Sequence, residues 1–229
     1  MKNYTKAILR NKPKTNNFDY ELINHILSVS KLCDYKDKIV VDIGCGEGKY
    51  KKVYKDFGFN YIGIDRGESQ STSFICDFGK DKLPFNNDSI DIFFCKSVLE
   101  HMYINEHAFL LEEIKRCLKR NGILILLIPD FRTCSYVFYN VYSHVTPFTY
   151  NSTKSMLKIY DFKIEHLDLI HFIPITWKKN IGAFFKFICL IIRNLGIKTK
   201  PLIIPKTNFG KFIRWSNELQ IFSIAKKNF

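Results

Sequence analysis

The sequence predicts an α/β protein with a doubly wound, mostly parallel sheet of seven strands and a helical insertion before the last strand. Three observations favour this fold class. Short apolar runs alternate with stretches of helical periodicity, turn residues separate them, and the central runs are apolar at every position. Strands without polar alternation are covered on both faces, as in parallel sheets with helical crossovers. We therefore expect a Rossmann-like sheet.

The expected elements follow one another along the chain. A helix at about Phe18–Leu32 comes first, because its apolar residues share one side. The expected strands of the first half are Lys38–Ile43, Tyr61–Asp65, Ser73–Asp77, Ile90–Cys95 and Ile123–Ile128. The helices between them are Gly48–Phe57 and His107–Lys119. An aromatic loop, Asp130–Tyr150, a helix, Ser152–Tyr160, a strand, Phe162–Leu169, and a last edge strand, Leu219–Ala225, complete the series.

A length of 229 residues allows one domain with an elaboration. We expect an N-terminal helical extension over residues 1–35 and a main domain over residues 36–170 together with 217–229. A basic, amphipathic helical insertion, the cap, is expected over residues 171–216.

Two appendages carry the net charge of +13. Residues 1–17 and 169–217 hold five and nine basic side chains and no acidic ones, whereas the remainder is close to neutral. This distribution indicates an anionic partner, namely a nucleic acid, a phosphorylated substrate or a lipid headgroup surface. The alternative interpretation is that the basic residues serve only to keep the protein soluble.

Cysteine usage and hydropathy indicate the compartment. The seven cysteines are scattered and form no C-x-x-C pair, which favours reduced thiols over disulfides or a zinc site. The first 18 residues lack the apolar segment of a signal peptide. The most apolar stretch, Ile181–Ile197, is interrupted by Lys186 and Arg193 and is shorter than a membrane span. We expect a cytoplasmic protein, with peripheral contact at the inner face of the membrane as a further expectation. No metal site is expected, because carboxylates and histidines are not clustered at ligand spacing.

The strongest functional signal is a buried strand that runs into three glycines, Val40-Val41-Asp42-Ile43-Gly44-Cys45-Gly46-Glu47-Gly48. Glycine permits a tight turn and the close approach of a ligand, and free amides at a helix start donate hydrogen bonds. A dinucleotide-binding loop would place its last glycine one position later, and Asp42 would repel a pyrophosphate. Asp42 suits a ligand with a cationic end, such as an α-amino group.

A second carboxylate, Asp65, ends the next expected strand. The carboxyl ends of parallel strands share one edge of the sheet, where an acid after the second strand binds ribose hydroxyls. The glycine loop and Asp65 together predict a nucleoside site. A merely structural turn is the alternative.

Three further stretches are specific in combination with the glycine loop: Cys76-Asp77-Phe78, Leu83-Pro84-Phe85-Asn86-Asn87-Asp88-Ser89-Ile90-Asp91 and Ser97-Val98-Leu99-Glu100-His101-Met102. With them the chain resembles the class I S-adenosylmethionine-dependent methyltransferases, of the small-molecule type related to the ubiquinone and menaquinone biosynthesis enzymes. The resemblance covers roughly residues 38–169 and the last strand. It implies S-adenosylmethionine (SAM) as the cofactor and a SAM-binding methyltransferase domain over residues 36–170 and 217–229.

The resemblance also implies individual roles. Asp42 and the glycine loop would hold the methionine part of SAM, and Asp65 the ribose. Asp77 would meet the adenine amine, Phe78 would pack beside the ring, and the segment from Lys96 to Val98 would line the sulfonium. The implied cofactor-binding residues are Asp42, Gly44, Cys45, Gly46, Gly48, Asp65, Arg66, Asp77, Phe78, Lys96 and Ser97. Glu47 departs from the small hydroxyl residue usual in the family, and we expect it to cap the helix start.

Two histidines are candidate catalytic bases. Methyl transfer is an in-line displacement at the sulfonium carbon, so the protein has to align the acceptor and remove the proton of a hydroxyl acceptor. His101 follows the fourth strand, and His144 lies in the segment 142–149, which borders the acceptor pocket in similar enzymes. Each could instead hydrogen-bond loop backbone. The other histidines, which we interpret as surface or packing residues, are His25, His107, His166 and His171.

The basic insertion contains an amphipathic helix between the sixth and seventh strands, within the segment from Trp177 to Arg214. Its apolar face is formed by Ile181, Phe184, Phe185, Ile188, Ile191, Ile192 and Leu195, opposite Lys179, Lys186 and Arg193. We expect this helix to cap the acceptor pocket. An interfacial helix on anionic lipid and an oligomer contact are the alternatives.

We therefore expect a methyltransferase that modifies a small molecule or a glycan, including a lipid-linked saccharide, at oxygen. A second hypothesis is an RNA-directed methyltransferase that grips phosphates with its basic appendages, and steeply salt-dependent RNA binding would favour it. Enzymes that methylate the exocyclic amines of bases have Asn-Pro-Pro-Tyr after the fourth strand, whereas this chain has Phe94-Cys95-Lys96-Ser97 there. Nucleic acid is therefore the less expected partner. A third hypothesis is a catalytically silent interaction module, which failure to bind SAM would favour.

Overall fold

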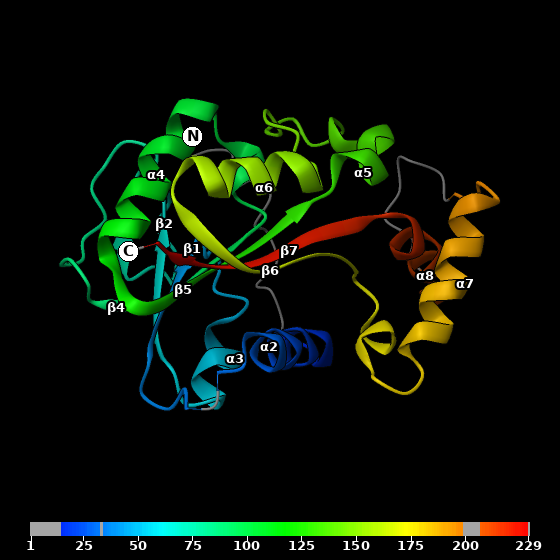
Figure 1. The fold of residues 1–229 in the computed structure, drawn as a ribbon, viewed down its shortest axis with the longest axis horizontal. Coiled ribbons are helices and arrows are strands. Elements are labelled where there is room, and N and C mark those ends of the chain that lie inside the picture. Colours follow the sequence, from blue (N-terminus) through cyan, green and yellow to red (C-terminus); the bar gives the residue numbers. More distant parts are fainter. Residues whose placement is uncertain (1–14, 33, 199–206, 229) are drawn as a thin grey trace.

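The computed structural model describes residues 15–32, 34–198 and 207–228, and it shows a seven-stranded sheet with helices on both faces (Figure 1). The strands are β1 (Ile39–Ile43), β2 (Asn60–Asp65), β3 (Phe74–Ile75), β4 (Ile90–Lys96), β5 (Leu118–Pro129), β6 (Phe162–His171) and β7 (Leu219–Lys227). Their order is β3-β2-β1-β4-β5-β7-β6. Only the two pairings that involve β7 are antiparallel. The prediction of a doubly wound, mostly parallel α/β sheet is confirmed.

Helices cover both faces of this sheet. They are α2 (Asn17–Ser30), α3 (Lys51–Asp56), α4 (Ile104–Cys117), α5 (Phe131–Phe138), α6 (Tyr150–Ile159), α7 (Gly182–Asn194) and α8 (Asn208–Asn217), with short 3-10 helices η1 (Leu99–His101) and η2 (Pro174–Trp177). In Figure 1, α4 and α6 lie on one face and α2 and α3 on the other. Phe93 of β4 packs in the first core and its neighbour Phe94 in the second. Because successive strand residues fill two cores, the central runs are apolar throughout.

The first described helix, α2, is anchored at both its start and its apolar face. Asn16 and Asp19 form a capping box, in which each side chain accepts the other residue's backbone amide. Lys49, which follows the glycine loop, pairs with the buried carboxylate of Asp19 at 2.9 Å. Leu22 and Ile26 are fully buried in the second core. The helix therefore covers the sheet, and residues 1–14 of the expected extension lie outside the described residues.

Two segments differ from the sequence-based expectation. Residues 130–150, expected as an aromatic loop, contain α5, whose first turn is closed by the carbonyl of Asp130 accepting the amides of Thr133 and Cys134. With only eight residues, α5 is too short for its helical periodicity to stand out in the sequence. β5 begins at Leu118, five residues earlier than expected, because Leu118 pairs with Ile90 of β4.

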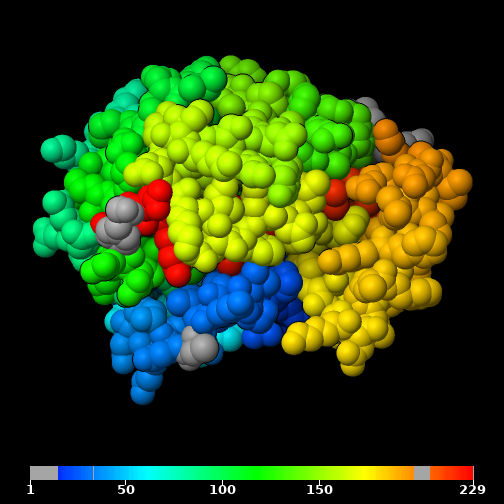
Figure 2. Space-filling view, in the orientation of Figure 1, coloured from blue at the N-terminus to red at the C-terminus, as the bar shows by residue number. Residues whose placement is uncertain are grey.

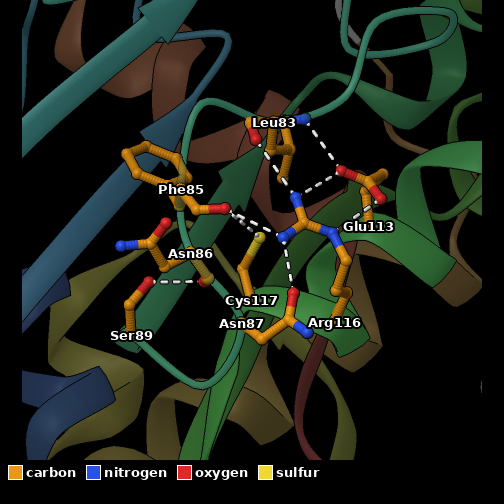
Figure 3. Close-up of polar contacts among 8 residues, drawn as sticks. All are labelled: Leu83, Phe85, Asn86, Asn87, Ser89, Glu113, Arg116 and Cys117. Atoms are coloured by element: carbon orange, nitrogen blue, oxygen red, sulfur yellow. Dashed lines mark hydrogen bonds and ion pairs between the residues drawn. The ribbon is translucent and has the colours of Figure 1, made fainter.

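Arg116, in the last turn of α4, holds the loop that leads into β4 (Figure 3). Its guanidinium donates to the carbonyl oxygens of Leu83 and Phe85 at 3.1 and 2.9 Å and pairs with Glu113 at 2.7 Å. Glu113 in turn accepts the amide of Leu83 at 2.9 Å, and the Arg116 bonds hold the pKa of this carboxyl below its usual range. These contacts therefore attach the end of α4 to the loop that precedes β4.

The insertion lies at the edge of the sheet where the parallel strands end. β6 ends at His171 and the antiparallel β7 begins at Leu219, so both face this edge. Figures 1 and 2 show α7 at this end of the molecule, and α8 lies beside it. Among the helices of the described ranges, none has the length and apolar character needed to cross a membrane.

Candidate functional site

The three glycines form the turn between β1 and α3, and all have positive φ angles of 69°, 51° and 74° at Gly44, Gly46 and Gly48. A Cβ at Gly44 would lie 2.5 Å from Val98, and one at Gly48 would lie 2.0 Å from the Ser71 hydroxyl. A Cβ at Gly46 would meet no described atom within 4 Å. The outer glycines therefore permit close packing within the protein, whereas Gly46 borders open space that a ligand could enter.

Asp65 ends β2 beside this turn. Its carboxylate accepts the amide of Gly46 at 2.8 Å and the amide of Gly67 at 3.0 Å. The Ser69 hydroxyl donates to the Gly46 carbonyl at 2.6 Å, and the Ser71 hydroxyl donates to the next carbonyl along the chain at 3.1 Å. The segment after β2 is thus folded onto the glycine loop. The sequence gives no sign of a role for these two serines, because their polar surroundings indicate only a loop.

Asp42 lies in β1 with 3% of its surface exposed. The Tyr61 hydroxyl donates to its carboxylate at 2.8 Å. Burial raises the pKa of Asp42 to about 7, and the charge of Asp65 adds to this shift. The hydrogen bond from Tyr61 and the charge of Lys96 oppose it. The carboxyl group is therefore close to half-protonated at neutral pH.

Lys96 and Ser97 stand at the end of β4, on the same edge as Asp65. Burial lowers the pKa of the Lys96 ammonium group, which lies 5.3 Å from the ring centroid of Phe172. Ser97 has a φ of 55°, a conformation that costs energy for a residue with a Cβ. Its amide donates to the Leu127 carbonyl at 2.9 Å, which helps to hold this conformation. Backbone strain of this kind is frequent at functional sites.

Arg66 connects the segments that follow β2 and β3. Its Nε lies 2.7 Å from a carboxylate oxygen of Asp77, and its Nη2 lies 2.8 Å from Glu106. Its guanidinium carbon is 5.1 Å from the ring centroid of Phe78, which is buried in the first core. Arg66 therefore holds Asp77, the residue expected to meet the adenine amine. Glu106 belongs to this group and was not expected from the sequence.

His101 and His144 lie side by side, with ring centroids 4.7 Å apart. His101 belongs to η1, and its Nδ1 lies 2.7 Å from the Ser143 hydroxyl and 3.3 Å from the Ser143 carbonyl. Nδ1 of His144 lies 2.7 Å from the carbonyl of Phe138. Burial, followed by the neighbouring His144, lowers the pKa of His101 to about 4, and burial also lowers the pKa of His144. Both imidazoles are therefore neutral at neutral pH.

The other four histidines pack elsewhere. His25 stacks on Trp177 at 5.0 Å, His107 contacts the Leu99 carbonyl, His166 lies 5.0 Å from Phe222, and His171 contacts the Trp215 carbonyl. Two surface cavities of about 270 and 290 Å³ lie beside α2 and share His25, Trp177 and Lys178 in their linings. The glycine loop does not line them, so neither cavity lies at the expected cofactor site.

Comparison with known proteins agrees with this geometry. Residues 41–126 match the family described as "Methyltransferase domain". The match runs from β1 into β5, and it contains the glycine loop, Asp65 and His101.

One relative and two solved structures extend this comparison. An uncharacterized protein of Methanocaldococcus jannaschii is 28% identical over 183 residues, 77% of this chain and 75% of the relative. A SAM-dependent methyltransferase from Archaeoglobus fulgidus is similar with a TM-score of 0.60 and 17% identity, over 91% of this chain and 94% of that one. A 1,6-didemethyltoxoflavin-N1-methyltransferase from Burkholderia thailandensis, solved with 1,6-didemethyltoxoflavin and S-adenosylhomocysteine, has a TM-score of 0.59 and 10% identity, over 100% and 84%. These two structures share the fold of this chain, and the family match over residues 41–126 supports a methyltransferase activity with S-adenosylmethionine as the cofactor.

Proposed function

We propose that the enzyme transfers the methyl group of SAM to a hydroxyl oxygen of a small molecule or glycan, with a lipid-linked saccharide as the favoured acceptor class. The pair of neutral imidazoles, His101 and His144, carries this proposal. His101 follows β4, the strand whose end also bears Lys96 and Ser97. The structural neighbour that methylates 1,6-didemethyltoxoflavin supports a small-molecule acceptor.

The proposed cofactor site follows the strand ends. Asp42 and the glycine loop hold the methionine part, with Gly46 bordering the open space that the ligand enters. Asp65 binds the ribose, and Asp77 with Phe78 and Arg66 surrounds the adenine. Lys96 and Ser97 lie next to the sulfonium. In the reaction, the acceptor oxygen attacks the methyl carbon in line with the carbon–sulfur bond, whose electron pair remains on sulfur.

The acceptor can be identified by isotope transfer. The enzyme is incubated with SAM that carries a labelled methyl group and an extract of the organism that makes it, and the labelled product is analysed by mass spectrometry and NMR. We expect a methoxy group on a small molecule or a saccharide. Label on nitrogen or carbon would contradict methylation at oxygen, and label in a nuclease-sensitive fraction would favour the RNA-directed alternative.

Replacing Asp65 by alanine is expected to weaken SAM binding by about 1 to 3 kcal/mol, because the ribose hydroxyls lose a charged acceptor. The amides of Gly46 and Gly67 lose the same acceptor, so part of this effect comes from the loop. Asp65→Asn retains one accepting oxygen, so its affinity for SAM should lie between those of the wild type and of Asp65→Ala. Calorimetric titration measures the affinities, and a wild-type value for Asp65→Ala would remove the proposed ribose site.

The affinity for SAM is expected to depend on pH through Asp42. In the free protein this carboxyl has a pKa of about 7, so below pH 7 it must lose a proton before it can pair with the cofactor's α-ammonium group. Affinity should therefore rise about tenfold per pH unit towards pH 7 and level off above it. Tyr61, Asp65 and Lys96 are the groups that tune this transition. Titration calorimetry from pH 5.5 to 8 measures it, and an unchanged pH dependence in Asp42→Asn would contradict the assignment.

The outward side of α7 supports a lipid-linked acceptor. Cys189 and Ile192 are buried and Phe185 is half-buried, whereas Phe184 and Phe187 are 63% and 58% exposed. The expected single apolar face is thus divided, because α7 packs against η2 and α8 with only one side. The exposed side chains of Lys178, Lys179 and Lys186 belong to the same part of the insertion. Exposed apolar residues beside lysines are typical of helices that rest on anionic lipid, and we propose this contact for α7.

Vesicles that contain phosphatidylserine are therefore expected to bind the protein. The double variant Phe184→Ser with Phe187→Ser should weaken binding at least about tenfold, because two aromatic side chains are no longer buried in lipid. Ile159→Ser is the matched control, since Ile159 is 74% exposed on α6. Co-sedimentation measures the bound fraction. Equal binding by the double variant and the control would exclude α7 as the contact.

A further inference from the structure

The side chains of two adjacent residues and of one distant residue converge beside the proposed acceptor site. Glu100 and His101 belong to η1, and His144 comes from the segment after α5. One ligand atom from each of the three lies within 4.8 Å of the others. Backbone bonds hold the two segments together, because the amides of Val145 and Thr146 donate to the Glu100 carbonyl at 2.9 and 3.1 Å.

Both imidazoles are oriented by backbone carbonyls. Nδ1 of His144 lies 2.7 Å from the Phe138 carbonyl, and Nδ1 of His101 lies 3.3 Å from the Ser143 carbonyl. A carbonyl can only accept a hydrogen bond, so Nδ1 of His144 carries the proton and its Nε2 carries a lone pair, whereas the Ser143 hydroxyl, 2.7 Å from Nδ1 of His101, can donate or accept. Histidines that bind metals characteristically donate their other ring N–H to a carbonyl or carboxylate. The His144 ring therefore offers its Nε2 atom as a ligand, and the His101 ring offers one of its two nitrogens.

Glu100 supplies the charge of the cluster. It is 1% exposed, and neither carboxylate oxygen has a hydrogen-bond partner among the described residues. A buried carboxylate without hydrogen bonds is costly. A cation bound at this place would offset that cost.

Two imidazoles and one carboxylate form the ligand set of zinc and of other divalent transition metals, whereas Mg²⁺ prefers oxygen ligands. Metal–ligand bonds of about 2.0 to 2.2 Å require ligand atoms about 3 to 3.5 Å apart. Small side-chain rotations would bring the three atoms from their present separation to that distance. Three protein ligands leave at least one coordination position open, as in catalytic sites.

We propose that Glu100, His101 and His144 bind a divalent transition-metal ion, and that an acceptor oxygen occupies its open position. The role of the ion in catalysis rests on the proposed O-methylation, whereas the binding of the ion does not. Coordination lowers the pKa of a hydroxyl group, whose proton leaves to solvent. The resulting oxyanion attacks the methyl carbon of SAM, and the electrons of the broken bond remain on sulfur.

Binding is tested on the full-length protein after treatment with a chelator. Titration with Co²⁺ should give one equivalent with visible absorption bands of nitrogen-coordinated cobalt, and Zn²⁺ should displace it whereas millimolar Mg²⁺ should not. Glu100→Gln and His144→Ala should each weaken Co²⁺ binding at least about tenfold. His166→Gln is the matched control, because His166 lies on β6 and packs against Phe222. Circular dichroism verifies that each variant is folded.

A stoichiometry far below one, or unchanged binding by folded Glu100→Gln and His144→Ala, would overturn the metal site. The catalytic role is measured separately with the acceptor identified by isotope transfer. Chelation should lower turnover at least about tenfold, and Zn²⁺ should restore it. Full turnover without metal would refute the catalytic role. Stoichiometric binding combined with methylation at nitrogen would instead overturn the proposed O-methylation and leave the metal site intact.

Discussion

Replacing Gly46 by valine is expected to weaken SAM binding at least about a hundredfold while the protein remains folded. A side chain at this position would point into open space rather than into the protein. In the proposed site the ligand fills that space, so the valine and the cofactor would compete for it. The φ of 51° adds strain of about 1 to 3 kcal/mol for a residue with a Cβ. Titration calorimetry measures the affinity, and the melting temperature reports the strain.

Two other glycine variants act as controls. Gly46→Ala introduces the same strain with a smaller side chain, so its loss of affinity should be smaller. Gly48→Ala should mainly lower the melting temperature, because its Cβ would collide with Ser71 rather than with the ligand. If Gly46→Val binds SAM as tightly as the wild type, the cofactor does not approach this loop.

Removing the imidazole of His101 is expected to lower kcat by about a hundredfold or more and to leave the affinity for SAM nearly unchanged. The reason is positional: His101 belongs to the pair beside the proposed acceptor site, whereas Asp42, Gly46 and Asp65 belong to the proposed cofactor site. Steady-state kinetics of His101→Ala with the identified acceptor, together with SAM titration, separates the two effects.

His144→Ala provides the comparison, because the two rings lie 4.7 Å apart and share one site. A metal held by both rings predicts that both variants lose kcat to a comparable extent and that chelators lower kcat of the wild type. A loss in His101→Ala alone, with no effect of chelators, agrees with a general base that acts directly. If both variants retain the full rate, the acceptor is a nitrogen, a carbon or an oxygen that is already ionised.

Hydrophobic periodicity and glycine spacing in the sequence were enough to predict the sheet and the glycine turn at which the cofactor site is proposed. The fully apolar runs in β1, β4 and β5 require burial on both faces, which only a covered parallel sheet supplies. The glycine turn followed by Asp65 at the next strand end predicted one shared edge, and the structure joins Asp65 to the Gly46 amide there. Both signals are local in sequence, so periodicity and spacing reveal them.

The sequence did not reveal the contacts that depend on how distant segments meet. α5 was not predicted because its eight residues are fewer than the roughly 11 to 18 over which helical periodicity is recognised. The division of α7 into a buried and an exposed side follows from where η2 and α8 pack against it, which a helical wheel does not contain.

The amino-acid sequence by itself determined the fold class, the glycine turn and the carboxylates at the strand ends, since strand burial and turn geometry are encoded by neighbouring residues. Only the tertiary structure decided that His144 meets Glu100 and His101, and that Arg66 holds Asp77. In both cases the partners come from the ends of different strands or from the segments that follow them. Parallel strands bring such segments to one edge whatever their separation along the chain, and the backbone bonds from Val145 and Thr146 to Glu100 then determine which side chains touch.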